Sequence, residues 1–165
     1  MKNNESITSL YGHDTVKKDS PQIMLRGEID SLLARAIAVC AYAKGNGFDE
    51  IYADASEIVH IIKMIMNSEA SACEIDITEI LKMTLDELRE VSYNPKKKLD
   101  ADHYFPDENS DMMTANLNLF RTDIRRTERY CVAAGLENGS NKCIQKVLNR
   151  LSSAVYIMMI KHNFK

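Results

Sequence analysis

Turn-forming residues are too scarce in this chain to support a fold of many short strands. The 165 residues include only three prolines and six glycines, and no tryptophan. Strand-rich folds need frequent turn residues, whereas long helices need few. Between the breakers, apolar residues recur at helical spacing, as in Ile51, Ala55, Ile58, Ile62 and Ile65. We therefore predict an all-α fold, an antiparallel five-helix bundle.

Local signals place the ends of the long helices. Ser20-Pro21 marks the start of the first helix, with serine as the cap and proline in the first turn. Gly45-Asn46-Gly47 ends that helix, and the second begins near Asp49. The same reasoning predicts the last two long helices over about 111–134 and 140–162.

The remaining segments are less regular. Residues 1–19 are polar, and we expect an irregular N-terminal segment whose first residues, Met1 to Glu5, are frayed. Between residues 69 and 94 we expect two short helical pieces, the second capped by Thr84 through a box with Glu87. Residues 93–109 read as a loop, long enough to indicate a functional role.

Composition bounds the class of protein. A chain of 165 residues with 45% hydrophobic and 27% charged residues is typical of one globular domain, so we expect a single domain over 1–165. The net charge of −3 argues against nucleic acid as a partner. No apolar run is long enough to cross a bilayer, so we expect no membrane association. The four cysteines are isolated and form no metal-binding spacing, which is typical of a cytoplasmic protein.

The segment 120–129 concentrates four arginines and one glutamate. On a helix, Arg121, Arg125 and Glu128 lie one above another, with Arg129 beside them, next to an apolar stripe. Guanidinium groups at the margin of a buried face can clamp phosphate or carboxylate. The alternative interpretation is a helix covered with ion pairs, for example between Asp123 and Arg126. The pattern alone leaves both open.

Three motifs in the C-terminal half together carry a family resemblance. They are the run from Asp100 to Pro106 (DADHYFP), the run from Asn118 to Thr122 (NLFRT), and the apolar helix that begins VLNRLSSAVY at Val147. This set resembles the ATP:cob(I)alamin adenosyltransferases of the five-helix-bundle type. The similarity is closest to the ethanolamine-utilisation branch of that family, and it extends back to Thr8.

The resemblance implies an enzyme that transfers the 5′-deoxyadenosyl group of ATP to cob(I)alamin, giving adenosylcobalamin and triphosphate. ATP with Mg²⁺ and cobalamin are the implied ligands, and cobalt is the nucleophile, so the protein needs none of its own. It also implies a homotrimer with active sites between subunits, a cob(II)alamin reductase that supplies the corrinoid, and an acceptor such as ethanolamine ammonia-lyase. Association with a bacterial microcompartment fits the same branch.

The resemblance assigns roles on the arginine-rich helix. Arg125 matches the main triphosphate contact, and Arg129 is a further ATP-binding residue. Arg121 matches an arginine that pairs across the subunit interface with an aspartate, here Asp30 of the segment Gly27-Glu28-Ile29-Asp30. Glu128 is expected to orient the arginines, or to contact a Mg²⁺ ion that is held mainly by the ATP phosphates.

Three further positions are implied to bind ATP: Asn149 on the last helix, and Lys18 and Thr8 near the N-terminus. The segment 2–8 (KNNESIT) departs from the family's nucleotide loop, because it lacks both glycines and the aspartate. Gln22 also replaces a family arginine. These departures keep an alternative open, a non-catalytic corrinoid- or ATP-binding bundle that acts as a sensor or escort. A generic helical scaffold is a third, weaker reading.

The loop and the helix after it carry the implied cobalamin site. The family places a bulky apolar side chain beneath the corrin ring to displace the lower axial ligand, and we favour Phe105 for this role, with Tyr104 second. His103 is expected in the same site, although a histidine on cobalt would supply the ligand that the chemistry must remove. Met112 and Asn116 are expected to line the site as well.

Overall fold

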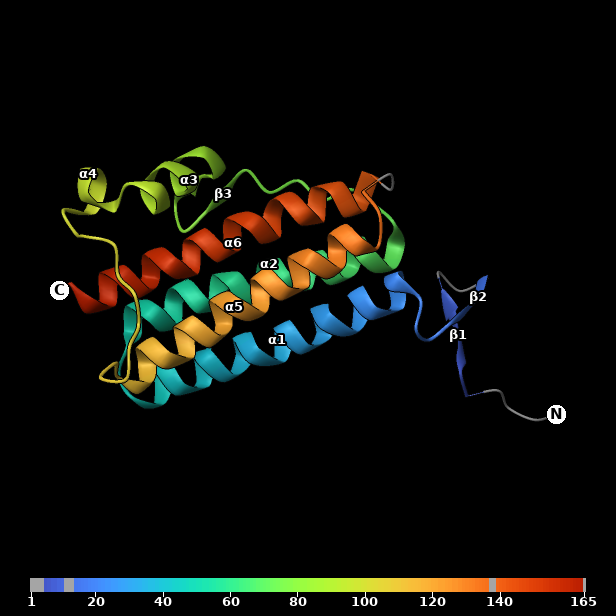
Figure 1. Cartoon of the computed structure of the whole chain (residues 1–165), viewed down its shortest axis with the longest axis horizontal. Coiled ribbons are helices and arrows are strands. Elements are labelled where there is room, and N and C mark those ends of the chain that lie inside the picture. The colour runs from blue at the N-terminus through green and yellow to red at the C-terminus, as the bar shows by residue number, and fades with distance from the viewer. Residues whose placement is uncertain (1–4, 11–13, 137–138, 165) are drawn as a thin grey trace.

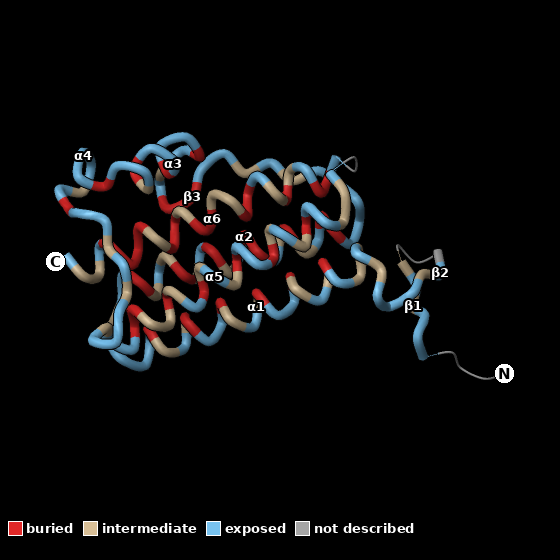
Figure 2. The backbone as a smooth tube through the Cα atoms, in the orientation of Figure 1, coloured by how far each residue is buried: buried red, intermediate tan, exposed pale blue. Residues whose placement is uncertain are grey.

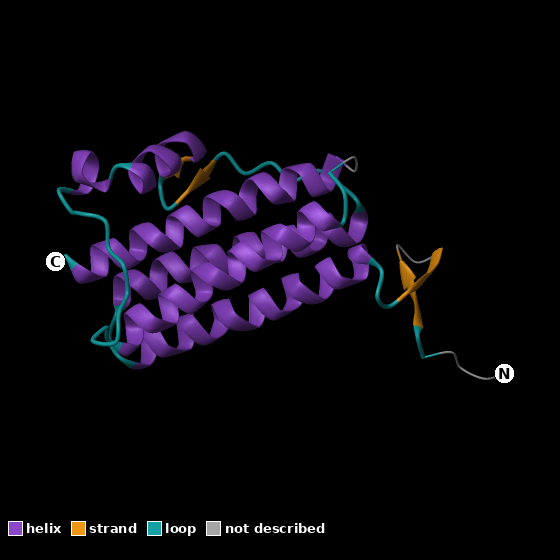
Figure 3. Ribbon diagram, viewed as in Figure 1, coloured by secondary structure: helices purple, strands orange, loops and turns teal. Residues whose placement is uncertain are grey.

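Four long helices lie side by side in the computed structural model (Figure 1). They are α1 (Pro21–Gly45), α2 (Asp49–Ser71), α5 (Met112–Ala133) and α6 (Gly139–Asn163). Each helix runs antiparallel to the neighbours it packs against, and Figure 3 shows how little strand accompanies them. The structure describes residues 5–10, 14–136 and 139–164. The predicted all-α antiparallel bundle is confirmed.

The ends of these helices follow the local signals closely. Pro21 occupies the first turn of α1 behind Ser20, and the helix stops at Gly45, with Gly47 at a φ of 74° that favours glycine. The α2 helix begins at the predicted Asp49. At the start of α5, the Asp111 carboxylate accepts a hydrogen bond from the Thr114 backbone N–H at 2.7 Å.

The core lies along the inward faces of the four helices, as the buried segments in Figure 2 show. Leu117, Phe120 and Ile124 of α5 are fully buried, and they belong to one apolar cluster with side chains of α1, α2, α3 and α6. Their spacing of three and four residues puts them on a single stripe. The arginines of α5 lie off this stripe, at the edge of the core rather than within it.

A long crossover connects α2 to α5 and returns along the outside of α6 (Figure 1). It contains the short pair β3 (Glu79–Ile80) and β4 (Met83–Thr84), then α3 (Leu85–Tyr93) and α4 (Pro95–Leu99). The α3 helix packs against α6 and makes the fifth helix of the bundle.

The prediction of two helical pieces between residues 69 and 94 was wrong for the first piece. A two-stranded turn forms there instead, because Leu81 and Lys82 adopt positive φ angles of 54° and 60° and reverse the chain. The Glu57 carboxylate fixes this turn by accepting the Leu81 N–H at 2.7 Å. The capping box was correct: the Glu87 N–H donates to Thr84 Oγ1 at 3.2 Å, and the Thr84 N–H donates to Glu87 Oε2 at 2.8 Å. The expected loop 93–109 also contains the short α4.

An antiparallel hairpin precedes α1 and lies beyond its N-terminal end (Figure 1). Its strands are β1 (Ile7–Leu10) and β2 (Asp14–Lys17), with Thr8 opposite Val16. The expectation of an irregular segment was therefore wrong over these residues, where β-branched side chains favour strand pairing. The expected fraying of Met1 to Glu5 lies outside the described residues except for Glu5, which is in a turn. None of the described helices is long and apolar enough to span a membrane.

Candidate functional site

A cleft of about 760 Å³ opens over the outer face of α6. One wall is α5, which contributes Arg121 and Arg125, and the opposite wall is α3. The loop residues 103–106 line the same cleft. The crossover therefore positions the motif-bearing loop beside the arginine-rich helix, and a volume of this size lies in the range of sites for cofactor-sized ligands.

Asn149 of α6 is held in this cleft by Glu128 of α5. Its Nδ2 donates to Glu128 Oε1 at 2.9 Å, and Gln145 Nε2 donates to the same oxygen at 3.0 Å. On the other side, Arg150 Nη1 donates to Asn149 Oδ1 at 2.7 Å. Glu128 thus contacts two amides in the described protomer rather than orienting an arginine. Sequence reasoning missed Gln145, although its position one turn before Asn149 puts it on the same face.

Arg121 and Arg125 present positive charge to the cleft without a carboxylate partner among the described residues. Arg121 donates from Nε and Nη2 to Asn118 Oδ1, at 3.3 and 2.9 Å. Partial burial lowers the pKa of Arg121, and the like charge of Arg125 lowers it further. Two neighbouring cations, of which Arg121 is partly buried and Arg125 exposed, favour an anionic ligand.

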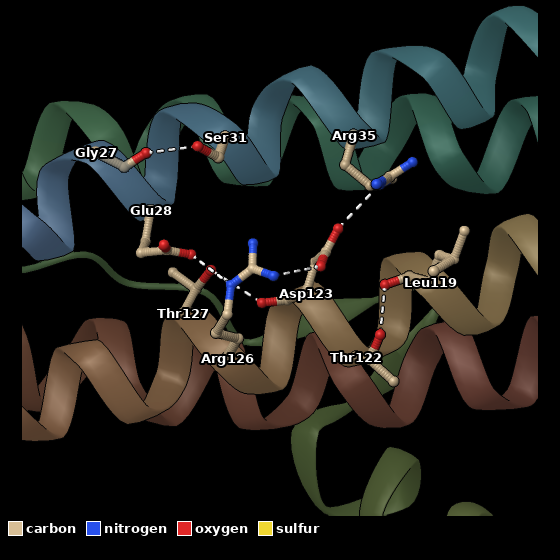
Figure 4. A network of polar contacts seen from close by, with 9 residues as sticks. All are labelled: Gly27, Glu28, Ser31, Arg35, Leu119, Thr122, Asp123, Arg126 and Thr127. Atoms are coloured by element: carbon tan, nitrogen blue, oxygen red, sulfur yellow. Dashed lines mark hydrogen bonds and ion pairs between the residues drawn. The ribbon is translucent and has the colours of Figure 1, made fainter.

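Arg126 behaves differently, because it belongs to an ion-pair network between α1 and α5 (Figure 4). Its Nε lies 2.8 Å from Glu28 Oε2, and its Nη1 lies 3.1 Å from Asp123 Oδ1, which confirms the pair proposed from the sequence. Asp123 also accepts from Arg35 Nε at 2.9 Å. The ion-pair interpretation therefore holds for Arg126 and not for Arg121 or Arg125.

The loop that lines the cleft is anchored to α6 by one tyrosine. Tyr156 Oη lies 3.0 Å from His103 Nδ1 and accepts the Tyr104 N–H at 3.2 Å. Tyr104 Oη lies 3.1 Å from Ser110 Oγ. Phe105 forms no hydrogen bond with Tyr156 among the described residues, its ring centroid lies 6.5 Å from that of His103, and it is 80% exposed at the cleft, which is unusual for a phenylalanine. Tyr156 was not predicted, although it lies seven residues after Asn149 on the same helical face.

Several residues assigned by resemblance lie outside this cleft. Arg129 is exposed and is not part of its lining. Met112 is 62% exposed at the start of α5, and Asn116 donates its Nδ2 to the Met112 carbonyl oxygen at 2.8 Å. Thr8 lies in β1 and Lys18 directly follows β2. Their roles stay predictions. Arg129 follows Arg125 by one turn of α5, whereas neither Thr8 nor Lys18 belongs to the lining of this cleft.

Asp30 is exposed on α1, and within the described protomer it forms no ion pair with Arg121. The pairing predicted between these residues is therefore left to a second subunit. The roles of the two side chains stay a prediction on this point.

Gln22, which replaces a family arginine, is part of a buried network at the start of α1. Its Nε2 donates to Glu69 Oε1 at 2.7 Å, and Arg26 Nε donates to Glu69 Oε2 at 2.7 Å. Asn141 of α6 donates to Gln22 Oε1 at 3.1 Å. The network ties three helices together at the bundle end nearest the hairpin.

The family model described as cobalamin adenosyltransferase matches residues 2–162 of the chain. The chain belongs to the cobalamin adenosyltransferase family. This family member is 29% identical over 163 residues to the corrinoid adenosyltransferase EutT of Salmonella typhimurium, covering 97% of the chain and 60% of that protein. It is 29% identical over 159 residues to EutT of Escherichia coli K12, covering 94% of the chain and 58% of that protein. The chain thus spans about 60% of the length of these curated relatives.

Solved structures support the fold of this cobalamin adenosyltransferase family member. A phenylalanine-to-histidine variant of the PduO-type ATP:corrinoid adenosyltransferase from Lactobacillus reuteri, complexed with cobalamin and ATP, superposes with a TM-score of 0.75 at 18% identity. That similarity covers 99% of this chain and 89% of the other. A phenylalanine-to-alanine variant, also with cobalamin and ATP, gives a TM-score of 0.74 at 19% identity, covering 99% and 91%.

Proposed function

We propose that the protein transfers the 5′-deoxyadenosyl group of ATP to cob(I)alamin, giving adenosylcobalamin and triphosphate. One observation carries this proposal: Arg121 and Arg125, which form no ion pair among the described residues of one protomer, share a single cleft with the exposed ring of Phe105. Such a cleft offers a cationic wall to a polyphosphate and an apolar side chain to a flat macrocycle. The curated relatives are named corrinoid adenosyltransferases, which fits both ligands.

The α5 wall of the cleft, with Arg125, binds the leaving triphosphate in this proposal. The bond from C5′ to the triphosphate oxygen breaks as the bond from cobalt to C5′ forms, so negative charge develops on the phosphate oxygens. Arg125 donates to these oxygens and stabilises that charge. Asn149, held by Glu128, aligns the nucleotide for in-line attack. Thr8, Lys18 and Arg129 are further proposed ATP contacts.

Mg²⁺ is proposed to bind with ATP on its phosphates, and Glu128, which is hydrogen-bonded to Asn149, is the carboxylate proposed to contact it. Glu128 Oε1 is committed to the two amides of Gln145 and Asn149. The described residues contain no cluster of three or more His, Cys, Asp or Glu side chains that would hold a metal by themselves.

The loop residues 103–106 bind the corrinoid in this proposal. Phe105 occupies the lower face of the ring and displaces the lower axial ligand, which makes reduction of Co(II) to Co(I) easier. Its neighbours His103 and Tyr104 are bound to Tyr156, so the His103 Nδ1 is engaged away from cobalt. Met112 and Asn116 lie in the first two turns of α5, directly after this loop, and are proposed to approach the corrinoid from there.

A homotrimer completes the site. Asp30 on one subunit pairs with Arg121 on the next, which brings the hairpin residues Thr8 and Lys18 toward a neighbour's cleft. Charge exchange tests this pair: Asp30→Arg or Arg121→Asp alone is expected to dissociate the assembly in sedimentation velocity, and the double exchange to restore it. A trimer that survives both single changes would refute the pairing.

A cob(II)alamin reductase and an adenosylcobalamin-dependent enzyme are the proposed protein partners.

Anaerobic turnover tests the activity. The protein is incubated with ATP, Mg²⁺ and chemically reduced cob(I)alamin, and the corrinoid absorbance is followed. Conversion to adenosylcobalamin is expected, with loss of activity in Arg125→Ala. Arg126→Ala is the matched control, because Arg126 is paired with Glu28 and Asp123 outside the cleft.

The outcome also separates the catalytic proposal from its alternative. A base-off spectrum of bound cob(II)alamin without conversion would indicate a non-catalytic binding protein, which the glycine-free segment 2–8 would explain. Neither conversion nor a spectral change would reject both functions.

A further inference from the structure

The cleft contains cationic side chains that the proposed triphosphate site does not use. Five cationic side chains line it, namely Arg89, Lys146 and Arg150 together with Arg121 and Arg125. Among the described residues that line the cleft there is no carboxylate, and none of the five forms an ion pair. The first three come from α3 and α6, away from the α5 wall.

The face of α6 divides these charges into two sets. Asn149 lies on the side of α6 that meets α5, because it bonds to Glu128. Ser153 lies further round α6 toward α3, where its Oγ is 3.2 Å from Ser92 Oγ. At about 100° per residue, Ser153 lies about 40° around the helix from Asn149, Lys146 about 60° and Arg150 about 100°, all in the same direction. Arg150 is therefore turned furthest from the α5 wall, toward α3 and Arg89.

Arg150 is fixed in place but not neutralised. Its only described hydrogen bond joins Nη1 to Asn149 Oδ1, at 2.7 Å. Its Nε is buried and has no acceptor among the described residues. A partly buried guanidinium without a counter-charge is unfavourable unless an anion approaches it. Arg89, exposed on α3 and 5.9 Å from the Tyr93 ring centroid, is positioned to contact the same anion.

We propose that Arg150 and Arg89 bind the phosphodiester in the nucleotide loop of the corrinoid substrate, at a subsite distinct from the triphosphate site. This rests on the proposed function. The peripheral amide side chains of cobalamin are neutral, so this phosphodiester is the anionic group that its periphery offers. Displacing the lower base releases the nucleotide loop from beneath the ring, which allows its phosphate to reach the α3 side. The subsite thereby favours phosphate-bearing corrinoids over those that lack this loop.

Binding of three corrinoids in the Co(II) state tests the subsite without turnover. Cobinamide lacks the nucleotide loop, cobinamide phosphate carries a phosphate but no base, and cobalamin carries both. Dissociation constants are measured by absorbance for the unaltered protein, Arg150→Gln, Arg89→Gln and the control Lys142→Gln, an exposed position on α6 outside the cleft.

We expect the unaltered protein to bind cobinamide phosphate about tenfold more tightly than cobinamide, the factor of one charge-assisted hydrogen bond. Arg150→Gln should remove most of this preference, Arg89→Gln part of it, and Lys142→Gln none. Affinity for cobinamide should stay within about twofold in both variants, and the KM for ATP within about twofold in Arg89→Gln, since neither depends on the phosphate contact. The preference should also weaken as salt increases.

Three results would overturn the proposal. The unaltered protein could bind both cobinamides equally, or Arg150→Gln could weaken all three corrinoids alike, which would make Arg150 a packing residue. A raised KM for ATP in Arg89→Gln, with an unchanged corrinoid preference, would assign these arginines to the triphosphate. Because Arg89 is exposed, Arg89→Gln keeps the test valid if Arg150→Gln fails to fold. Absence of turnover in the unaltered protein would refute the enzyme function, yet leave this binding preference measurable.

Discussion

Asn149 on α6 donates a hydrogen bond from Nδ2 to Glu128 Oε1 on α5, at 2.9 Å. Gln145 donates to the same oxygen at 3.0 Å. One carboxylate therefore holds two amides of the neighbouring helix and sets the direction of Asn149. Asn149 Oδ1 also accepts a hydrogen bond from Arg150. Asn149 therefore links the α5 wall of the cleft to its α3 side.

Glu128→Ala is expected to lower kcat/KM for ATP by about tenfold to a hundredfold, because a lost hydrogen bond to a charged group costs about 1.5–3 kcal/mol. Gln145→Ala leaves the Asn149 contact in place and should have a much smaller effect. Steady-state kinetics with limiting ATP measures both. Equal losses in the two variants would contradict the assignment of Glu128 to positioning Asn149.

In the buried network at the start of α1, substitutions of Arg26 and of Glu69 should reduce the free energy of unfolding by different amounts. The side chain of Glu69 is 2% exposed, whereas that of Arg26 is 36% exposed. Arg26→Met leaves a buried carboxylate supported by Gln22 alone, and should reduce the free energy of unfolding by about 2 kcal/mol, less than a fully buried pair because Arg26 reaches solvent. Glu69→Gln leaves the cation partly hydrated and should cost less. Urea denaturation measures both, and the reverse order would be inconsistent with this network.

Asp111 is expected to give an acid-dependent contribution to stability. Burial by itself would raise the pKa of this carboxyl, but hydrogen bonds from the Thr114 N–H and from His162 outweigh it, and the pKa is lowered. The contribution is therefore full above the unfolded pKa of about 3.9 and is lost as pH falls through the folded pKa.

Asp111→Asn isolates this charge, because asparagine also caps a helix. The variant should be less stable by no more than about 1 kcal/mol at pH 7, since the Asp111 side chain is 54% exposed and solvent screens it. The difference should begin to shrink below the unfolded pKa of about 3.9 and vanish only once pH has fallen through the lowered pKa of the folded carboxyl. Thermal unfolding followed from pH 7 down through the acid range measures it, and a difference that stays constant throughout would refute the charge as its cause.

The cysteines should differ sharply in reactivity. Burial raises the pKa of the Cys131 thiol to about 12, with the Glu128 charge adding to the effect, and its Sγ donates to the Asn141 carbonyl at 3.1 Å. At pH 8 roughly one Cys131 in ten thousand is thiolate, the reactive form. Cys73 is exposed. A thiol-specific chromophoric disulfide should therefore modify Cys73 rapidly, and Cys131 only on unfolding. Cys73→Ser should abolish the fast phase, and rapid labelling of native Cys131 would contradict the burial.

The long helices could be predicted from the sequence because their signals are local. Helical periodicity of apolar residues and the breakers Gly45 to Gly47 act within a few residues, and so does the capping box of Thr84 with Glu87. The margin position of Arg121, Arg125 and Glu128 follows from the same periodicity. The motif that carries the family resemblance is likewise a property of spacing along the chain.

Contacts between segments that lie far apart in the sequence could not be predicted in this way. Arg125 and Arg126 are neighbours in the sequence, yet only Arg126 is neutralised, because Glu28 of α1 lies against it from 98 positions away. Arg89 becomes a cleft residue only because the crossover returns along α6. The reversal at Leu81 and Lys82 depends on a carboxylate of α2, Glu57, which no local pattern reveals.

The sequence by itself determined the class of fold, the four long helices and the chemical types gathered at the site. The tertiary structure decided which cations stay without carboxylates, and where the crossover carries the loop of Phe105. The physical reason is the range of the interactions. Backbone hydrogen bonding and side-chain periodicity act over one or two helical turns, whereas desolvation and charge pairing depend on neighbours that packing brings from elsewhere in the chain.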